Sequence, residues 1–425
     1  MVAPTVTPSA EPLAASSAHP ALRPAITAAW AWLRVHGPIS ALLIVGAALR
    51  SFRLGEVSGM LIGDECWYVQ DARVILGLPV MLKNLPAAPL SGLDPNSEHP
   101  PLAKLIMAGS MRLFGNTEIA WRIPSVILGT LSILLLYAIV LRLGGSRKQA
   151  WLAAFVLAFE NLSFIHGRIA MLDIYVVAFV LLATWLYLTR RFELAGVVFG
   201  VAALCKVNGL FGLGAMLLYD LVRARRHLWP IPWRWLWPRA RAVIFALGFF
   251  LLGLGALDAY WTEYRSPFAH LSHMFSYHAS LKHVGRPEGN ESTPGDWWLN
   301  GGAFNYMTWT QTVNGVSKYT VFRAAMNEYV IFAAPMALFY AAWRAWNRSR
   351  LGAFAVASLI CMFGPMFAAW VLADRKSYIF YMVPSVPAIA CAIALMAPKL
   401  PRPAQWGFVV AVLYAYAFNF PFKYL

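Results

Sequence analysis

Charged residues and cysteines are scarce in this chain of 425 residues. Charged side chains make up 13% of the sequence, whereas globular proteins average about 25%. The four cysteines, at positions 66, 205, 361 and 391, are scattered and show neither CxxC nor metal-ligand spacing, so we expect inert buried thiols. There is also no glycine-rich motif that would cradle a phosphate. These scarcities exclude a disulfide-stapled secreted fragment and predict no recognisable metal or nucleotide site.

Hydrophobic residues, in contrast, make up 60% of the sequence, with 18 Trp, 17 Tyr and 26 Phe. The mean hydropathy of +0.58 indicates a polytopic membrane protein and excludes a disordered chain or a soluble two-domain enzyme. Apolar runs long enough to cross a bilayer predict eleven spans, near 38–54, 122–141, 149–164, 169–189, 193–206, 208–222, 241–260, 327–343, 351–373, 378–397 and 404–421. Lys206 and Asn208 interrupt one long run, which predicts either a tight turn between two short helices or a kink in one.

The net charge of +16 comes from 35 Lys and Arg against 19 Asp and Glu. With eleven spans, the connections on the N-terminal side carry basic residues and no acidic ones; they are 142–148, 190–192, 223–240, 344–350 and 398–403. By the positive-inside rule this side is cytoplasmic. We therefore expect the basicity to record topology, with the N-terminus inside and the C-terminus outside, and we expect no nucleic-acid partner.

Two outer connections, residues 55–121 and 261–326, are too long to be simple linkers, and long ordered loops usually carry function. Residues 1–35, rich in Ala, Pro, Ser and Thr, predict a disordered cytoplasmic tail. No signal peptide with a basic start and a cleavage site precedes the first span, so we expect that span to stay in the membrane. The chain then divides into the tail, a transmembrane module over 36–260 that includes the first outer loop, a second outer loop over 261–326, and C-terminal helices over 327–425.

Adjacent carboxylates open the first outer loop, at Asp64 and Glu65 directly beyond the first span. Carboxylates so close to hydrocarbon are costly, which favours a functional role. An alternative interpretation is equally open: the acids belong to an ordinary solvated loop, or Asp64 caps a helix over 65–76.

A second motif in this loop runs from Glu98 through His99, two prolines and Lys104. The prolines predict an extended entry into a helix. His99 and Lys104 would flank the start of that helix, where backbone N–H groups favour an anion.

Cations stand at the outer ends of several predicted spans. Arg168 lies five residues before Asp173, and either binds a phosphate or forms a helix-end pair with that acid. Lys206 interrupts an apolar run, where a charge is expensive unless it meets a cavity or an anion. Arg375 adds a further outer cation. One base and several cations on one side fit a lipid-linked phosphate, which lies at headgroup level.

The order of these motifs resembles the protein O-mannosyltransferases. The matching elements are Asp64-Glu65, His99-Pro100-Pro101-Leu102 with Lys104, Trp121-Arg122-Ile123-Pro124-Ser125, Arg168 through Asp173, and Lys206 before Gly209-Leu210-Phe211; weaker matches follow at Tyr277-His278 and beyond. The resemblance implies an all-α polytopic GT-C glycosyltransferase fold with about eleven transmembrane helices and two long outer loops. The second outer loop is too short for the β-trefoil domain of eukaryotic members, which implies a bacterial type.

By this resemblance, Asp64 would be the catalytic base, with Glu65 beside it, in a catalytic module over residues 36–260. Arg168 and Lys206, joined by Arg375, would hold the donor phosphate. His99, Lys104, Asp173 and His278 are further site candidates.

The implied reaction is an inverting transfer of mannose from a polyprenyl-phosphate donor to Ser/Thr hydroxyls of exported proteins, on the outer face of the plasma membrane. No cofactor is required, although Asp64 and Glu65 leave a divalent ion open. Two alternatives stand beside it: a same-fold transferase that moves an aminoarabinose- or arabinose-type sugar to a lipid or polysaccharide, and a transporter or flippase. The transporter predicts repeated halves, and the sequence shows no similarity between its halves.

Overall fold

The computed structural model describes residues 22–56, 59–81, 92–225, 232–283, 289–313 and 316–424. It divides into two compact units, Met1–Leu42 and Leu43–Leu425. The first helix, α1 (Leu22–Ser51), crosses the boundary between them. Of the predicted tail, residues 1–21 lie outside the described residues, and residues 22–35 are helical as the first half of α1.

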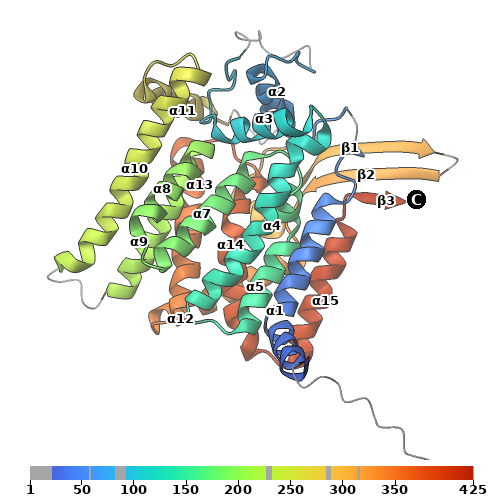
Figure 1. Cartoon of the computed structure of the whole chain (residues 1–425), viewed down its shortest axis with the longest axis vertical. Coiled ribbons are helices and arrows are strands. Elements are labelled where there is room, and N and C mark those ends of the chain that lie inside the picture. The colour runs from blue at the N-terminus through green and yellow to red at the C-terminus, as the bar shows by residue number, and fades with distance from the viewer. Residues whose placement is uncertain are drawn as a thin grey trace, which may run out of the picture. The chain divides into compact units, whose positions relative to one another are not determined.

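The second unit is predominantly helical (Figure 1). Its α-helices are α2 (Glu65–Ile75), α3 (Leu102–Phe114), α4 (Glu118–Arg142), α5 (Arg147–Phe159), α6 (Asn161–His166), α7 (Leu172–Leu188), α8 (Phe192–Cys205), α9 (Leu210–Ala224), α10 (Trp233–Trp261), α11 (Pro267–Ser280), α12 (Glu328–Trp346), α13 (Arg350–Ala373), α14 (Val386–Met396) and α15 (Arg402–Phe418). Short 3-10 helices are η1 (Val207–Gly209), η2 (Asp296–Leu299), η3 (Ile379–Ser385) and η4 (Ala397–Lys399).

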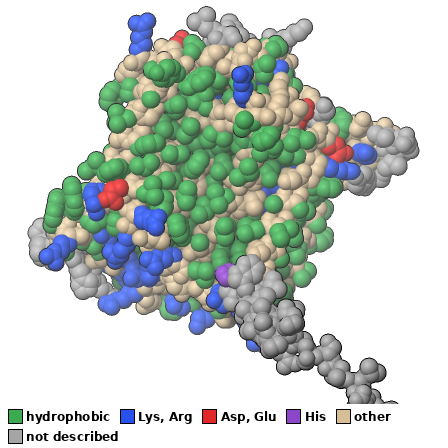
Figure 2. Space-filling model, in the orientation of Figure 1, with side chains coloured by type: hydrophobic (Ala, Val, Ile, Leu, Met, Phe, Trp, Pro, Cys, Tyr) green, Lys and Arg blue, Asp and Glu red, His purple; other side chains and the backbone are tan. Residues whose placement is uncertain are grey.

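Five helical stretches among the described residues are long and apolar enough to cross a membrane: Glu118–Arg142, Val207–Ala224, Trp233–Trp261, Arg350–Ala373 and Ile379–Lys399. Shorter apolar helices include α7 and α8. Each of the eleven predicted runs overlaps a helix of the structure, which confirms a multi-span helical protein, while the count of eleven transmembrane helices stays a prediction. The face shown in Figure 2 carries a broad hydrophobic band, with Lys and Arg gathered near the joined ends of α9 and α10.

The interruption at Lys206 is a break between two helices. α8 ends at Cys205, and Lys206 is extended, with φ −163° and ψ 130°. The turn η1 then leads into α9. At Gly209 a Cβ atom would lie 2.4 Å from the carbonyl carbon of Ala202, so only glycine allows this close return of the chain. The break leaves the Lys206 side chain at the end of α8 instead of inside a continuous apolar helix.

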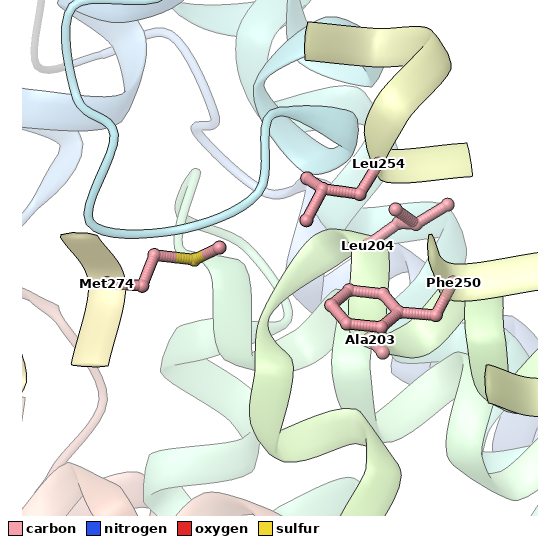
Figure 3. Close-up of a cluster of buried hydrophobic side chains, with 5 residues drawn as sticks. All are labelled: Ala203, Leu204, Phe250, Leu254 and Met274. Carbon is pink, nitrogen blue, oxygen red and sulfur yellow. The ribbon is translucent and has the colours of Figure 1, made fainter. Parts of the chain in front are cut away.

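α11 lies across the outer ends of α8 and α10 and is held there by apolar contacts. Leu204, Phe250, Leu254 and Met274 form one buried cluster with Ala203 (Figure 3). Burying such side chains typically contributes about 1.5–3 kcal/mol each. The cluster therefore fixes α11, and the residues that follow Met274 on it, relative to the membrane helices.

A small antiparallel sheet accompanies the helices, and the sequence analysis did not predict it. Its strands are β1 (Phe304–Val313), β2 (Val316–Ala324) and β3 (Phe422–Tyr424), in the spatial order β1-β2-β3. The register between β1 and β2 shifts between Asn305 and Met307, as at a β-bulge. The second outer loop is thus built from α11, η2 and a hairpin.

Candidate active site

A cavity of about 780 Å³ opens among the helix ends near α2 and α11. Its walls come from the first outer loop, the start of α7, the break between α8 and α9, α11, the start of β1, and the segment from α13 to η3. Six of the predicted site residues line it: Asp64, His99, Asp173, Lys206, His278 and Arg375. The folded chain therefore collects into one space residues that are more than 300 positions apart.

Asp64 is one of the residues that line this cavity. It occupies the N-cap position of α2, but its side chain makes no capping hydrogen bond. The helix predicted after Asp64 is present, whereas the predicted side-chain cap is not. Burial raises the pKa of the Asp64 carboxyl to about 6, and the nearby positive charge of Lys206 acts in the opposite direction. A carboxylate with a raised pKa is a better proton acceptor for an alcohol than an ordinary aspartate.

Asp173 and Lys206 form the charged floor of the cavity. The Lys206 Nζ donates to Asp173 Oδ1 at 2.8 Å. His166 lies on the other side of Asp173, with its Nδ1 3.7 Å from Oδ2, and its Nε2 is 2.9 Å from the hydroxyl of Tyr306. The predicted pair between Arg168 and Asp173 is wrong: Lys206 takes that partner, because the chain break turns its side chain toward the start of α7.

Arg375 and two histidines form another part of the wall. The Nη2 of Arg375 is 3.0 Å from Nδ1 of His278, and the ring centroid of His278 lies 5.3 Å from that of His99. Burial lowers the pKa of His278 to about 4, with Arg375 contributing in the same direction, and burial also holds the pKa of His99 well below its usual value. Both imidazoles are therefore neutral near pH 7. Among the described residues, the cations that line the cavity are Lys206 and Arg375.

Glu65 does not line the cavity, and its predicted catalytic role is corrected by its contacts. Its carboxylate accepts two hydrogen bonds from Arg122, at 2.8 and 2.7 Å, and one from the backbone N–H of Ala170 at 2.8 Å. The backbone N–H of Ile62 donates to it at 2.9 Å. Glu65 is fully buried, so it ties the start of α2 to α4 and thereby fixes the neighbouring Asp64.

Replacing Glu65 by Ala is expected to lower the free energy of unfolding by about 3–5 kcal/mol, because it leaves the buried Arg122 guanidinium without its counter-charge. Thermal unfolding of the purified protein in detergent measures the loss. The double variant Glu65→Met/Arg122→Met should recover part of it, since no unpaired charge is then left. A single variant as stable as wild type would contradict the structural role.

Arg168 is also not at the cavity, which corrects its predicted role in phosphate binding. Its Nη2 donates to the carbonyl oxygen of Phe52 at 2.6 Å. Its guanidinium lies over the rings of Phe164, Phe322 and Phe422, between 5.0 and 5.6 Å from their centroids. The residue is buried, and these contacts give it a place in the packing beneath the sheet.

Lys104 is likewise a buried structural residue, although it was predicted to flank an anion site. It pairs with Asp94 at 2.5 Å and donates to the carbonyl oxygens of Asn96 and His99. Because Asn96 and His99 line the cavity, Lys104 acts through the segment that it holds. The helix predicted after the prolines is present as α3, with Pro101 at its N-cap.

The same loop segment is tied from its other side to α10 and α11. His270 Nδ1 lies 2.7 Å from Asp258 Oδ1, and His270 Nε2 lies 2.9 Å from the carbonyl oxygen of Ser97. The ring of Tyr264 stacks on His270 with centroids 4.4 Å apart. Ser97 therefore connects the first outer loop to the base of α11.

The sequence analysis did not predict a place in the site for three residues that line the cavity: Glu98, Tyr277 and Tyr306. Glu98 accepts a hydrogen bond from the hydroxyl of Tyr277, and burial raises the pKa of Glu98. The sequence analysis named Glu98 as the first residue of the motif that continues with His99, but it predicted no role for its carboxylate. Tyr306 would have required recognising the alternating pattern of residues 306–313 as a strand.

Metal and thiol chemistry find no organised site in the part of the chain that the structure describes. No group of three or more His, Cys, Asp or Glu side chains there is arranged to hold a metal ion. The four cysteines are unpaired, and Cys205 and Cys391 are buried in apolar helices. Since Glu65 is committed to Arg122, it does not share a ligand site with Asp64.

Comparison with known proteins gives this site a context. A family model described as dolichyl-phosphate-mannose-protein mannosyltransferase matches residues 98–250. The polyprenol-phosphate-mannose–protein mannosyltransferase of Mycolicibacterium smegmatis is 24% identical over 368 residues, which cover 70% of each chain.

Two solved structures share the fold. The Saccharomyces cerevisiae protein O-mannosyltransferase Pmt1–Pmt2 complex, bound to the sugar donor, superposes with a TM-score of 0.66 and 12% identity, covering 91% of this chain and 89% of that one. ArnT from Cupriavidus metallidurans, bound to undecaprenyl phosphate, superposes with a TM-score of 0.58 and 17% identity, covering 89% of this chain and 63% of that one.

The chain therefore has the GT-C fold of multi-pass membrane glycosyltransferases. Its sequence is similar to protein O-mannosyltransferases, through the family model over residues 98–250 and through the Mycolicibacterium smegmatis relative. The fold class that the sequence motifs predicted is confirmed, and the similarities agree with the predicted family and enzyme class. The assignment of individual residues to the site rests on the contacts described above and not on these comparisons.

Proposed function

We propose that the protein transfers mannose from a polyprenyl-phosphate donor to Ser or Thr hydroxyls of protein acceptors. The observation that carries the proposal is the meeting of Asp64, Lys206 and Arg375 at one outer cavity. A carboxylate with a raised pKa and two cations are the groups that this reaction needs. The activities for which the similar proteins are named support mannose as the sugar and a protein as the acceptor.

In the proposed reaction Asp64 accepts the proton of the acceptor hydroxyl as its oxygen attacks the anomeric carbon of mannose. The bond from that carbon to the phosphate oxygen breaks, and the electron pair leaves with the polyprenyl phosphate. Lys206 and Arg375 stabilise the charge that develops on this phosphate. Attack opposite the leaving group inverts the anomeric centre. No cofactor enters the scheme.

The cavity is proposed to face the extracytoplasmic side of the plasma membrane. α2, α3 and the sheet lie at one end of the helices, and the C-terminal end of α9 and the N-terminal end of α10, near which Lys and Arg gather, lie at the other (Figures 1 and 2). The positive-inside rule then places the N-terminus in the cytoplasm. A lipid phosphate at headgroup level would reach Lys206 from within the membrane.

The direct test incubates the purified protein with radiolabelled polyprenyl-phosphate mannose and a Ser/Thr-rich peptide. Label in the peptide, removed by α-mannosidase, is the expected result. A parallel reaction with polyprenyl-phosphate aminoarabinose tests the alternative sugar. This control is included because the chain shares its fold with ArnT. Transfer of aminoarabinose without transfer of mannose would overturn the proposal, and so would movement of the lipid without any transfer.

The raised pKa of Asp64 predicts an acid limb in the pH dependence of the reaction. Because the carboxylate form is the active base, kcat/KM should fall as the pH drops through about 6, by about tenfold for each further pH unit. Initial rates between pH 4.5 and 8 measure this limb. A profile that stays level down to pH 5 would show that no group with this pKa is the base.

A further inference from the structure

β1 is an edge strand, and one of its two sides is open. In the sheet order β1-β2-β3 its neighbour on one side is β2, and the described residues place no strand on the other (Figure 1). The N–H of Val321 on β2 donates to the carbonyl of Pro421 at 2.9 Å, on the β3 side. Thr308 is the β1 residue opposite Val321. Because the backbone groups of Val321 point toward β3, Thr308 and Val321 form a non-hydrogen-bonded antiparallel pair. In such a pair the backbone N–H and C=O groups of the two residues point away from each other, so those of Thr308 point to the open side of β1.

The same alternation applies along the strand. Thr310 and Thr312 follow Thr308 at intervals of two residues, so their N–H and C=O groups also face the open side. All three side chains are exposed. The result is a ladder of unpaired backbone groups that spans roughly 14 Å at about 3.4 Å per residue.

This edge lacks the features that usually protect an open strand. Native proteins blunt such edges with charged side chains, prolines or bulges. β1 contains no charged residue and no proline, and its irregularity lies at the inner end, between Asn305 and Met307. An uncharged edge whose register with β2 is regular over residues 307–313 is suited to pairing with another extended chain.

The inner end of the same strand forms part of the cavity wall. Phe304, Asn305 and Tyr306 line the cavity. The Tyr306 ring packs so closely on Gly63 that a Cβ there would lie 2.6 Å from a ring carbon, and Asp64 is the next residue. A chain that followed the edge of β1 inward would therefore arrive beside Asp64.

We propose that the acceptor polypeptide docks in extended form on the open edge of β1, pairing with the backbone of Thr308, Thr310 and Thr312, and that this pairing delivers its hydroxyl to Asp64. The inference rests on the proposed function, since it names the docking surface for the acceptor of that reaction. The occupant is an unfolded or extended segment that contains Ser or Thr. Because backbone groups make the contacts, the surface accepts many sequences.

Thr310→Pro tests the docking edge. Proline removes the outward N–H and places its ring on the open side, while the hydrogen bonds of β1 to β2 are retained. We expect the KM for a ten-residue Ser/Thr peptide to rise about tenfold, with kcat changed by less than twofold. Gln311→Ala is the matched control, because this exposed side chain belongs to a residue whose backbone faces β2; its KM should stay within twofold of wild type.

Peptides methylated on the backbone nitrogen test the same surface with the wild-type protein. Two peptides are compared, each methylated on every second backbone nitrogen. Transfer should be weakened when the methylated nitrogens belong to the residues whose N–H groups face β1. It should be little affected when they belong to the alternate residues, whose N–H groups face away. Equal transfer from both peptides, or an unchanged KM for Thr310→Pro, would overturn the docking proposal. So would conversion of a wild-type dimer into monomers by Thr310→Pro, which would make the edge an interface between copies. Absence of any mannose transfer by the wild type would instead refute the proposed function.

Discussion

Mannose transfer by the Asp64→Asn variant is expected to fall by about 10²–10⁴-fold, the usual contribution of a positioned general base. Asn keeps the size of the side chain but cannot accept the proton. Because Asp64 makes no capping hydrogen bond, the substitution should leave α2 and the stability of the protein intact. Initial rates with saturating donor and peptide measure the loss, and binding of the donor, measured separately, should persist.

Glu98→Gln is the matched control, since Glu98 is the other acid of the first outer loop that lines the cavity. Its hydrogen bond with Tyr277 engages it elsewhere, so its rate should stay within about tenfold of wild type. If Glu98→Gln lost the larger factor while Asp64→Asn kept its activity, the base would be Glu98.

The Lys206→Met variant is expected to reduce kcat by about 10²–10³-fold, the effect of removing one group that stabilises a developing oxyanion. Lys206 reaches the cavity from the break between α8 and α9, and methionine matches its length without the charge. Single-turnover rates with labelled donor separate this chemical step from binding.

Two variants distinguish loss of the phosphate contact from disturbance of the site. In Asp173→Asn the ammonium of Lys206 keeps a neutral partner, so a smaller loss than in Lys206→Met is expected. Arg168→Met removes a cation outside the cavity, and the KM for donor should change by less than twofold. A large donor defect in Arg168→Met would return phosphate binding to Arg168.

The membrane helices were predictable because the length of an apolar run carries most of the information. Every predicted run overlaps a helix, and Lys206 and Asn208 marked the position of the break between α8 and α9. Asp64, Lys206 and Arg375 were predicted to face the same side, and they line one cavity. The predicted topology alone was enough for this, since it put all three residues at the outer ends of predicted spans.

The pairing of charges could not be read from spacing. Asp173 is five residues from Arg168 but forms its ion pair with Lys206, 33 positions away, because the extended residue at the helix break redirects the lysine. Glu65, adjacent to Asp64, turns the opposite way and meets Arg122. Neighbours at the start of a helix point in different directions, so adjacency did not imply a shared role.

The hairpin was missed for a different reason. Residues 306–313 alternate in the way that strands do, but within a chain so rich in apolar helices the alternation was read as an outer loop. Its third strand comes from residues 422–424, about 100 positions later, and no local pattern announces such a partner.

The hydrogen bonds of His270 to Ser97 and Asp258 connect two parts of the cavity rim, the first outer loop and α11. The loop that presents Glu98 and His99 is fastened to the base of α11, which itself presents Tyr277 and His278. If α11 swings outward to admit the bulky lipid, the loop must travel with it. A displacement of this helix would therefore change the positions of Glu98 and His99 together with those of Tyr277 and His278.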